Sequence, residues 1–267
     1  MKKAISFVVI LAVLFVGYVI GVRGVRGVVE IEISPIYSYE LPDKEYGFTC
    51  TGLTKATDGS WWIGSYGKET PESSSIQPSL VNVSNDFKVI RDEINRDSSD
   101  NIQGLAFDNK TNSIWFSNGK EISNVSLTGE VISSFRLPKS NVVPNGVAYN
   151  EQDDSIWVLG YEDYLYGFTK RGELIDLLSI DYPDQDHICF DENGDLWFFY
   201  GADYLGKNNY VCKYDMVERR VEVQYKVLNS YAIEGIYRDN NLLFVANDGV
   251  YHQSKDGKNI INVYSLK

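Results

Sequence analysis

The sequence predicts an all-β protein, a β-propeller of four-stranded antiparallel blades, from three observations. Five segments of similar pattern recur at intervals of about 40 to 50 residues, a spacing typical of propeller blades. A second apolar run follows each segment after a turn. The chain contains 19 Tyr and 5 Trp, and aromatic side chains favour strands. One four-stranded sheet cannot bury both faces, whereas a closed ring of such sheets can.

The first strand of each repeat is predicted where a polar residue precedes a short apolar run. In four of the five repeats a glycine follows that polar residue. The five polar residues are Thr51, Gln103, Asn145, Asp186 and Glu234. Because first strands line the central channel of a propeller, these side chains should meet at one channel mouth although they lie far apart in the sequence.

The second strand of each repeat is predicted at a run of aromatic and branched residues preceded by turn formers such as Asp58-Gly59 and Asn193-Gly194. These runs are Trp61–Ile63, Ile114–Phe116, Ile156–Val158, Leu196–Phe198 and Leu243–Val245. The recurrence of Trp61, Trp115, Trp157 and Trp197 at about one strand position indicates a core between blades.

Third and fourth strands complete each repeat. For the last repeat the pattern predicts a third strand at Val250-Tyr251 and a fourth at Ile260–Leu266. The segment Ile36–Pro42 resembles the outer-strand ending Ser134–Pro138, so we expect the N-terminal segment to add an outer strand that helps to close the ring. The number of blades, five or six, stays open. A β-sandwich would explain the strands but not the regular spacing of the repeats.

The first 27 residues predict a segment separate from the propeller domain at residues 28–267. The chain has no charged residue from Ala4 to Val22, a length that could just cross a bilayer as one apolar helix. We interpret it as a signal anchor or a signal peptide, with a buried core helix as the alternative. The domain is then expected outside the cytoplasm, either anchored to the membrane through this helix or secreted.

Charge and cysteine content exclude some functions. The net charge of −12 argues against a nucleic-acid partner, because neutralising phosphates requires a basic surface. The three cysteines have no metal-ligand spacing. Cys189 and Cys212 fall on neighbouring elements of one repeat and could form a disulfide in an exported chain; otherwise all three are small buried side chains.

Four of the polar residues at the channel mouth form a candidate metal site. Gln103, Asn145, Asp186 and Glu234 offer amide or carboxylate oxygens, the ligands that Ca²⁺ prefers. The alternative is a polar ring that only solvates the channel. Only two histidines are present: His187 adjoins the ring and is the candidate catalytic base, while His252 is expected on a third strand at the blade surface.

Two segments carry a resemblance to a known family. Pro144–Ala148 and Asp186–Trp197 resemble segments of the gluconolactonase and senescence-marker superfamily of calcium-dependent propellers, and more loosely NHL-type repeats. The resemblance implies that Asn145 and Asp186 ligate a metal ion. The family's first-blade glutamate corresponds to a position near Thr51, and its glycine after the aspartate is His187 here. Glu234 could supply the missing carboxylate.

Two functions are compatible with these patterns. The first is an extracytoplasmic module that binds or senses a small-molecule or protein ligand at its channel mouth. The alternative is a calcium-dependent hydrolase of lactones or esters. The sequence contains no Gly-x-Ser-x-Gly, phosphate-loop or His-Glu-x-x-His motif that would indicate another chemistry.

Overall fold

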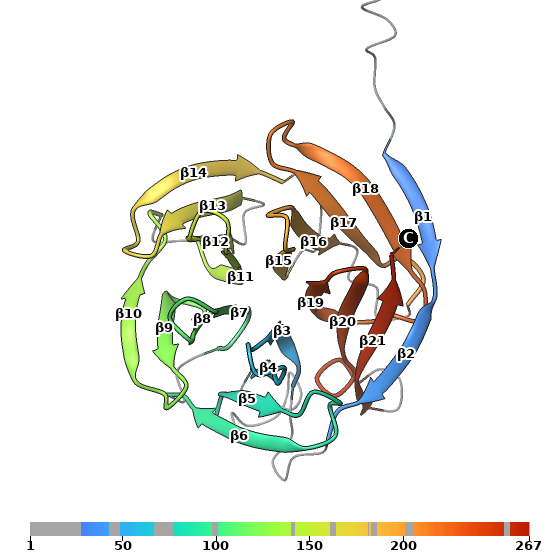
Figure 1. Cartoon of the computed structure of the whole chain (residues 1–267), viewed down its shortest axis with the longest axis horizontal. Coiled ribbons are helices and arrows are strands. Elements are labelled where there is room, and N and C mark those ends of the chain that lie inside the picture. Colours follow the sequence, from blue (N-terminus) through green and yellow to red (C-terminus); the bar gives the residue numbers. More distant parts are fainter. Residues whose placement is uncertain are drawn as a thin grey trace, which may run out of the picture.

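The protein is a ring of five blades around a central axis (Figure 1). The computed structural model describes residues 28–42, 49–66, 77–97, 101–139, 142–160, 164–180, 182, 186–200, 206–253 and 257–266. The predicted all-β fold of four-stranded antiparallel blades is confirmed, and the number of blades is five. The predicted N-terminal helix lies outside the described residues. Within the described residues, no helix is long and apolar enough to cross a membrane.

The first four blades each contain four strands that follow one another outward from the axis. The first contains β3 (Thr51–Lys55), β4 (Trp61–Ser65), β5 (Ser79–Val83) and β6 (Ile90–Asn95). The second contains β7 (Leu105–Asp108), β8 (Ser113–Ser117), β9 (Ile122–Ser126) and β10 (Val131–Phe135). The third contains β11 (Pro144–Asn150), β12 (Ser155–Gly160), β13 (Tyr164–Thr169) and β14 (Leu174–Ser179). The fourth contains β15 (Ile188–Phe190), β16 (Leu196–Tyr200), β17 (Tyr210–Asp215) and β18 (Arg220–Val227).

The fifth blade joins the two ends of the described chain. It consists of β19 (Ile233–Asp239), β20 (Leu242–Asp248), β21 (Asn259–Ser265) and β2 (Pro35–Glu40). The N-terminal strand β2 pairs antiparallel with β21, which confirms the expected outer strand that closes the ring.

The sequence prediction for the last repeat was wrong in its strand order. The run 260–266 belongs to the third strand, not the fourth, and Val250-Tyr251 lies in a turn. The reason is the length of β20, which pairs with β21 over its whole extent, from Leu242 to Asp248. The residues that follow Asp248 are therefore needed to reverse the chain.

One strand was not anticipated from the sequence. The strand β1 (Val29–Ile33) runs parallel to β18 and adds a fifth strand to the outer edge of the fourth blade. The N-terminal segment thus spans the outside of two adjacent blades, with β1 on the fourth and β2 on the fifth (Figure 1).

The core consists of five apolar clusters, one between each pair of neighbouring blades. In the first four blades a tryptophan on the second strand packs toward the next blade, opposite a short side chain of the first strand; the pairs are Thr54 with Trp62, Ala106 with Trp115, Ala148 with Trp157 and Cys189 with Trp197. The expected repeat position is confirmed for three of these. In the first blade it belongs to Trp62, because Trp61 pairs with Lys55 and packs on the fifth blade. All three cysteines are buried and free.

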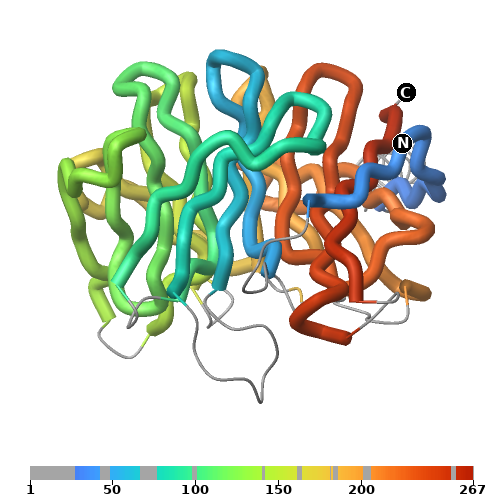
Figure 2. The backbone as a smooth tube through the Cα atoms, turned by 90° about the horizontal axis from the view of Figure 1, so that it is seen from below, coloured from blue at the N-terminus to red at the C-terminus, as the bar shows by residue number. Residues whose placement is uncertain are grey.

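The two faces of the ring differ in their connections. The tight turns between first and second strands, such as those at 56–60 and 109–112, lie on one face, which we call the hairpin face (Figure 2). The amino ends of the first strands, with Thr51, Gln103 and Glu234, lie at the opposite face, which we call the loop face. The channel therefore has two mouths of different construction.

Candidate functional site

The first strands pack so closely that they close the channel between its two mouths. A Cβ atom placed on Gly104 would lie 2.6 Å from Cα of Gly146, and one on Gly235 would lie 2.9 Å from Cα of Gly52. Backbone therefore contacts backbone around the axis, and only glycine fits at these positions. This layer, which we call the waist, explains why a glycine follows the polar residue in four of the five repeats.

The fifth member of the waist is His187, whose side chain is 1% exposed. Its Nδ1 accepts a hydrogen bond from the backbone N–H of Ile236 at 3.4 Å, across the boundary between the fourth and fifth blades. Burial lowers the pKa of His187 to about 4, while a hydrogen bond with the Leu105 backbone acts in the opposite direction. The ring is therefore neutral at neutral pH, and its Nε2 is completely buried.

On the loop face, the side chains at the amino ends of the first strands surround a cavity of about 170 Å³. We call it the loop-face pocket; its lining residues are Thr51, Tyr66, Gln103, Asp186, Glu234, Asp248, Tyr251 and His252. Three of the four predicted metal ligands line it. In β3, β11 and β19 the register shifts at the polar residue and its glycine, and such bulges redirect side chains at the end of a strand.

The fourth predicted ligand, Asn145, lies beside the pocket and supports Asp186. Its Nδ2 donates a hydrogen bond to Oδ1 of Asp186 at 2.6 Å, and the side chain is 3% exposed. Its Oδ1 is buried and has no hydrogen-bond partner. In this arrangement the amide of Asn145 fixes the carboxylate of Asp186, which faces the cavity.

Two of the acidic groups in the pocket are held in an environment that disfavours their charge. Burial, and then the nearby carboxylate of Asp186, raise the pKa of Glu234 well above its usual range. Burial and Glu234 raise the pKa of Asp248 to about 7, although the N–H groups of Tyr251 and Cys50 act in the opposite direction. Among the described residues that line the pocket, His252 is the one basic side chain.

The sequence predicts His252 on a third strand at the surface of a blade, and this prediction was wrong. His252 lies in the loop-face pocket. It belongs to the turn after β20, and its Nε2 lies 2.8 Å from Oε1 of Glu234. Burial lowers the pKa of His252, so the contact is formed by two groups that both favour their neutral forms.

Sequence reasoning missed Asp248, Tyr66 and Tyr251, because they come from the ends of second strands and from the turn after β20. The rings of Tyr66 and Tyr251 meet edge to face at 5.6 Å and form one wall of the pocket. A signal for Asp248 was present: the pair Asn247-Asp248 directly follows a buried apolar run, and in an antiparallel hairpin that position lies beside the start of the first strand.

The pocket contains three carboxyl groups and the amide of Gln103, and the oxygen atoms of such groups are the ligands that a hard cation prefers. Among the described residues, no three acidic, histidine or cysteine side chains lie close enough together to hold a metal ion. The calcium site expected from the sequence therefore stays a prediction.

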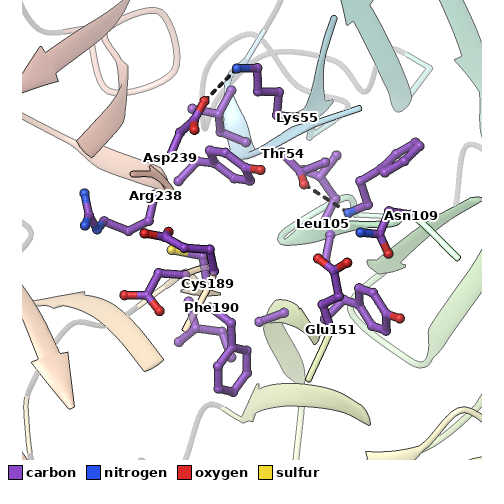
Figure 3. Close-up of a pocket in the computed structure, with 18 of the residues that line it drawn as sticks. Thr54, Lys55, Leu105, Asn109, Glu151, Cys189, Phe190, Arg238 and Asp239 are labelled. Atoms are coloured by element: carbon purple, nitrogen blue, oxygen red, sulfur yellow. Dashed lines mark hydrogen bonds and ion pairs between the residues drawn. The ribbon is translucent and has the colours of Figure 1, made fainter. Parts of the chain in front are cut away.

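At the hairpin face the channel opens into a second cavity of about 260 Å³, which we call the hairpin-face pocket (Figure 3). Its walls follow the first strands from their carboxyl ends inward to Leu53, Leu105 and His187. At its rim Lys55 forms an ion pair with Asp239, with Nζ 2.7 Å from Oδ2. His187, the candidate base, lines this pocket and not the loop-face pocket.

Comparison with known proteins supports the fold. No protein-family model matches the chain, and no curated protein matches its sequence. Among solved structures, streptogramin B lyase is similar over 86% of this chain and 73% of its own, with a TM-score of 0.51 and 16% identity. A chain of a nidogen–laminin complex is similar over 76% of this chain and 73% of its own, with a TM-score of 0.54 and 13% identity.

The WD40 β-propeller domain of Doa1 gives a similar match, with a TM-score of 0.51 and 14% identity over 79% of this chain and 62% of its own. These neighbours have different functions by their names, and their identities are low. The likeness therefore shows a propeller fold and leaves function to the site.

Proposed function

We propose that the protein is a ligand-binding propeller whose loop-face pocket takes a positively charged group, carried by a small molecule or by a protein. The observation that supports this proposal most strongly is the charge of the pocket. Asp186, Glu234 and Asp248 converge on one cavity, and His252 is the only basic side chain among the described residues that line it. Burial and, after it, the nearby carboxylates raise the pKa values of Glu234 and Asp248, and a bound cation would favour the charged forms that both effects disfavour.

The tyrosine wall of the pocket supports the same ligand class. The rings of Tyr66 and Tyr251 border the cavity, and aromatic faces attract cations as well as apolar carbon. Two kinds of cation are candidates. The resemblance to calcium-dependent propellers implies calcium, and the tyrosine wall favours an alkylammonium group.

The test is calorimetric titration of the protein with calcium chloride and, separately, with ethylammonium chloride. We expect at least one of the two to bind, and Asp186→Asn and Glu234→Gln each to weaken that binding tenfold or more. A cation at about 100 times its Kd stabilises the folded state by about 2.7 kcal/mol, which thermal unfolding would detect. Glu130→Gln, which changes an exposed acid in the turn before β10, is the matched control. Binding that survives in the Asp186→Asn, Glu234→Gln double variant would place the cation elsewhere.

The alternative function, hydrolysis of lactones or esters, is favoured by one observation, the contact of His252 with Glu234 inside the pocket. Such a pair could transfer a proton to or from a bound substrate. Small lactones and esters are therefore assayed with calcium present. If the protein is a hydrolase of this kind, His252→Gln abolishes turnover. His187→Gln tests the base that the sequence predicts. Turnover that is lost in His187→Gln and kept in His252→Gln would identify His187 as the base.

A further inference from the structure

We propose that a third cavity, which lies between the first and second blades, binds a neutral sugar or cyclic polyol. The cavity has a volume of about 500 Å³, within the range of small-molecule sites. We call it the interblade groove; its lining includes Trp62, Asn82, Arg91, Asp92, Asn112 and Leu127. It shares no lining residue with the loop-face pocket, so this proposal is independent of the function proposed for that pocket.

The groove results from a small side chain on the third strand of the second blade. In the next three blades this strand carries an aromatic residue that packs toward the preceding blade; the three are Phe168, Tyr214 and Tyr264. The second blade has Val125 at the same position, opposite Ile114. Because valine is much smaller than these aromatic residues, the boundary beside Trp62 is filled less completely.

The hydrogen-bond donor of the groove is the indole N–H of Trp62, whose side chain is 3% exposed. The equivalent tryptophans of the next three blades donate to a side chain of their own blade; the pairs are Trp115 with Asp108, Trp157 with Ser155 and Trp197 with Asp191. The first blade has Ala56 where two others have the aspartate, so it offers no acceptor. Within the described part of the chain the Trp62 N–H donates no hydrogen bond, and it keeps accessible surface in the groove.

The acceptor beside this donor is the amide oxygen of Asn82. Asn82 pairs with Trp62 across β4 and β5, so the two side chains lie on the same face of the blade. Its Nδ2 donates to Oγ of Ser60 at 2.9 Å and to the backbone oxygen of Trp61 at 3.2 Å, and Oδ1 accepts no hydrogen bond from the described residues. A hydroxyl group both accepts and donates, so a sugar hydroxyl matches this donor and acceptor together.

The charged groups of the groove favour a neutral ligand. Nη1 of Arg91 lies 2.9 Å from Oδ2 of Asp58, so these two charges balance each other. Asp92, which pairs with Asn82 on the next strand, adds a second carboxylate that would repel an anion. A cation would carry only donors and could not accept from the Trp62 N–H. Hydroxyl groups avoid both conflicts, because carboxylates, guanidinium and amide groups all form hydrogen bonds with them.

The experiment follows the indole ¹⁵N–¹H signals of the full chain in a detergent without a sugar headgroup. The protein has five tryptophans, and the other four indole N–H groups already donate hydrogen bonds. The probes are glucose, galactose, mannose and myo-inositol. We expect at least one of them to shift the Trp62 signal downfield in a saturable way and to leave the other four signals unchanged. Glucuronate and glucosamine are charged and should bind at least tenfold more weakly than that probe.

The variant Ala56→Asp supplies the missing acceptor from the protein itself. The turns at 56–60 and 191–195 have the same backbone hydrogen bonds, from the first N–H to the fifth carbonyl and from the fourth N–H to the first carbonyl. In both, the tryptophan lies six positions after the first residue. Ala56→Asp should therefore shift the Trp62 signal downfield without sugar and reduce sugar binding tenfold or more. Asn193→Asp adds the same charge to the exposed turn of the fourth blade and should leave binding unchanged.

Three results would overturn the proposal. The first is a Trp62 signal that responds to none of the four probes, which would mean that the groove holds only water. The second is binding of glucuronate or glucosamine as tight as that of the neutral probe. The third is unchanged sugar binding in Ala56→Asp, which would place the sugar elsewhere. The probe series on the unmodified protein gives the answer even if Ala56→Asp does not fold.

Discussion

Among single residues, Asp248 most clearly shows a conflict between stability and binding. The side chain is 1% exposed and shares the loop-face pocket with Glu234, so its charged form has lost water. Among the described residues that line the pocket, only His252 acts in favour of that charge. Burial raises its pKa to about 7. An acid kept in such a position destabilises the folded protein at alkaline pH, and that cost is expected where a site is built to bind a ligand.

The pH dependence of stability follows from this shift. The pKa of Asp248 is higher in the folded state than in the unfolded state. Its stabilising contribution to the free energy of unfolding is therefore fully present below about pH 4, and it is lost as the pH rises through about 7. Asp248→Asn should therefore raise the free energy of unfolding at pH 8 by roughly 2 to 4 kcal/mol and change it little at pH 4. Urea unfolding at the two pH values measures this, and an equal effect at both would contradict it.

Sequence reasoning located part of the pocket because repetition marks the first strands. Three lining residues could be predicted in this way, namely Gln103, Asp186 and Glu234. Each occupies the same position in its repeat, and a ring of repeated strands places the side chains at that position close together. Asp248 and His252 occupy positions that have no counterpart of the same chemistry in other repeats. The exact placement of Asn145 depends on one hydrogen bond to Asp186, which no spacing in the sequence encodes.

At the level of elements, the strand β2 holds the ring closed. It supplies the outer strand of the fifth blade, and Leu41, directly after it, is buried in the cluster between the fifth and first blades. Without β2 the edge of β21 would be unpaired, and an exposed strand edge pairs readily with other chains.

Two truncations separate the contribution of β2 from that of β1. A chain that begins at Ser34 loses β1 but keeps β2, and should remain folded and monomeric with a modest decrease in Tm. A chain that begins at Pro42 loses both strands, and should unfold at much lower temperature or associate through β21. Size-exclusion chromatography and thermal unfolding compare the two. Closely similar behaviour would show that β2 does not close the ring.

The strand order of the last blade shows where sequence patterns fail. Val250-Tyr251 looks like a short strand, since it has two β-favouring residues at the expected distance from β20. Backbone pairing decides otherwise, because β21 matches β20 residue for residue and leaves these two in a turn. The parallel strand β1 could not be predicted, as its pairing with β18 joins residues nearly 200 positions apart and has no counterpart in the other blades.

For the whole molecule, the prediction to test is its location. If the uncharged stretch from Ala4 to Val22 is an anchor, the full chain should sediment with membranes, and deletion of residues 1 to 27 should release a folded, soluble domain. Fractionation of cells followed by immunoblotting measures this. A mature protein that begins near Val25 would show instead that the segment is a cleaved signal peptide.

The strand β1 has a mechanical consequence if the chain is held by its N-terminus. Tension applied there would reach β1 first, before the β2–β21 pairing that closes the ring. The five residues of β1 are mostly exposed and pair with β18 alone, so they would detach at a lower force than β2. Under force, β1 would therefore detach first and absorb part of the extension, while the ring and both of its pockets stay folded.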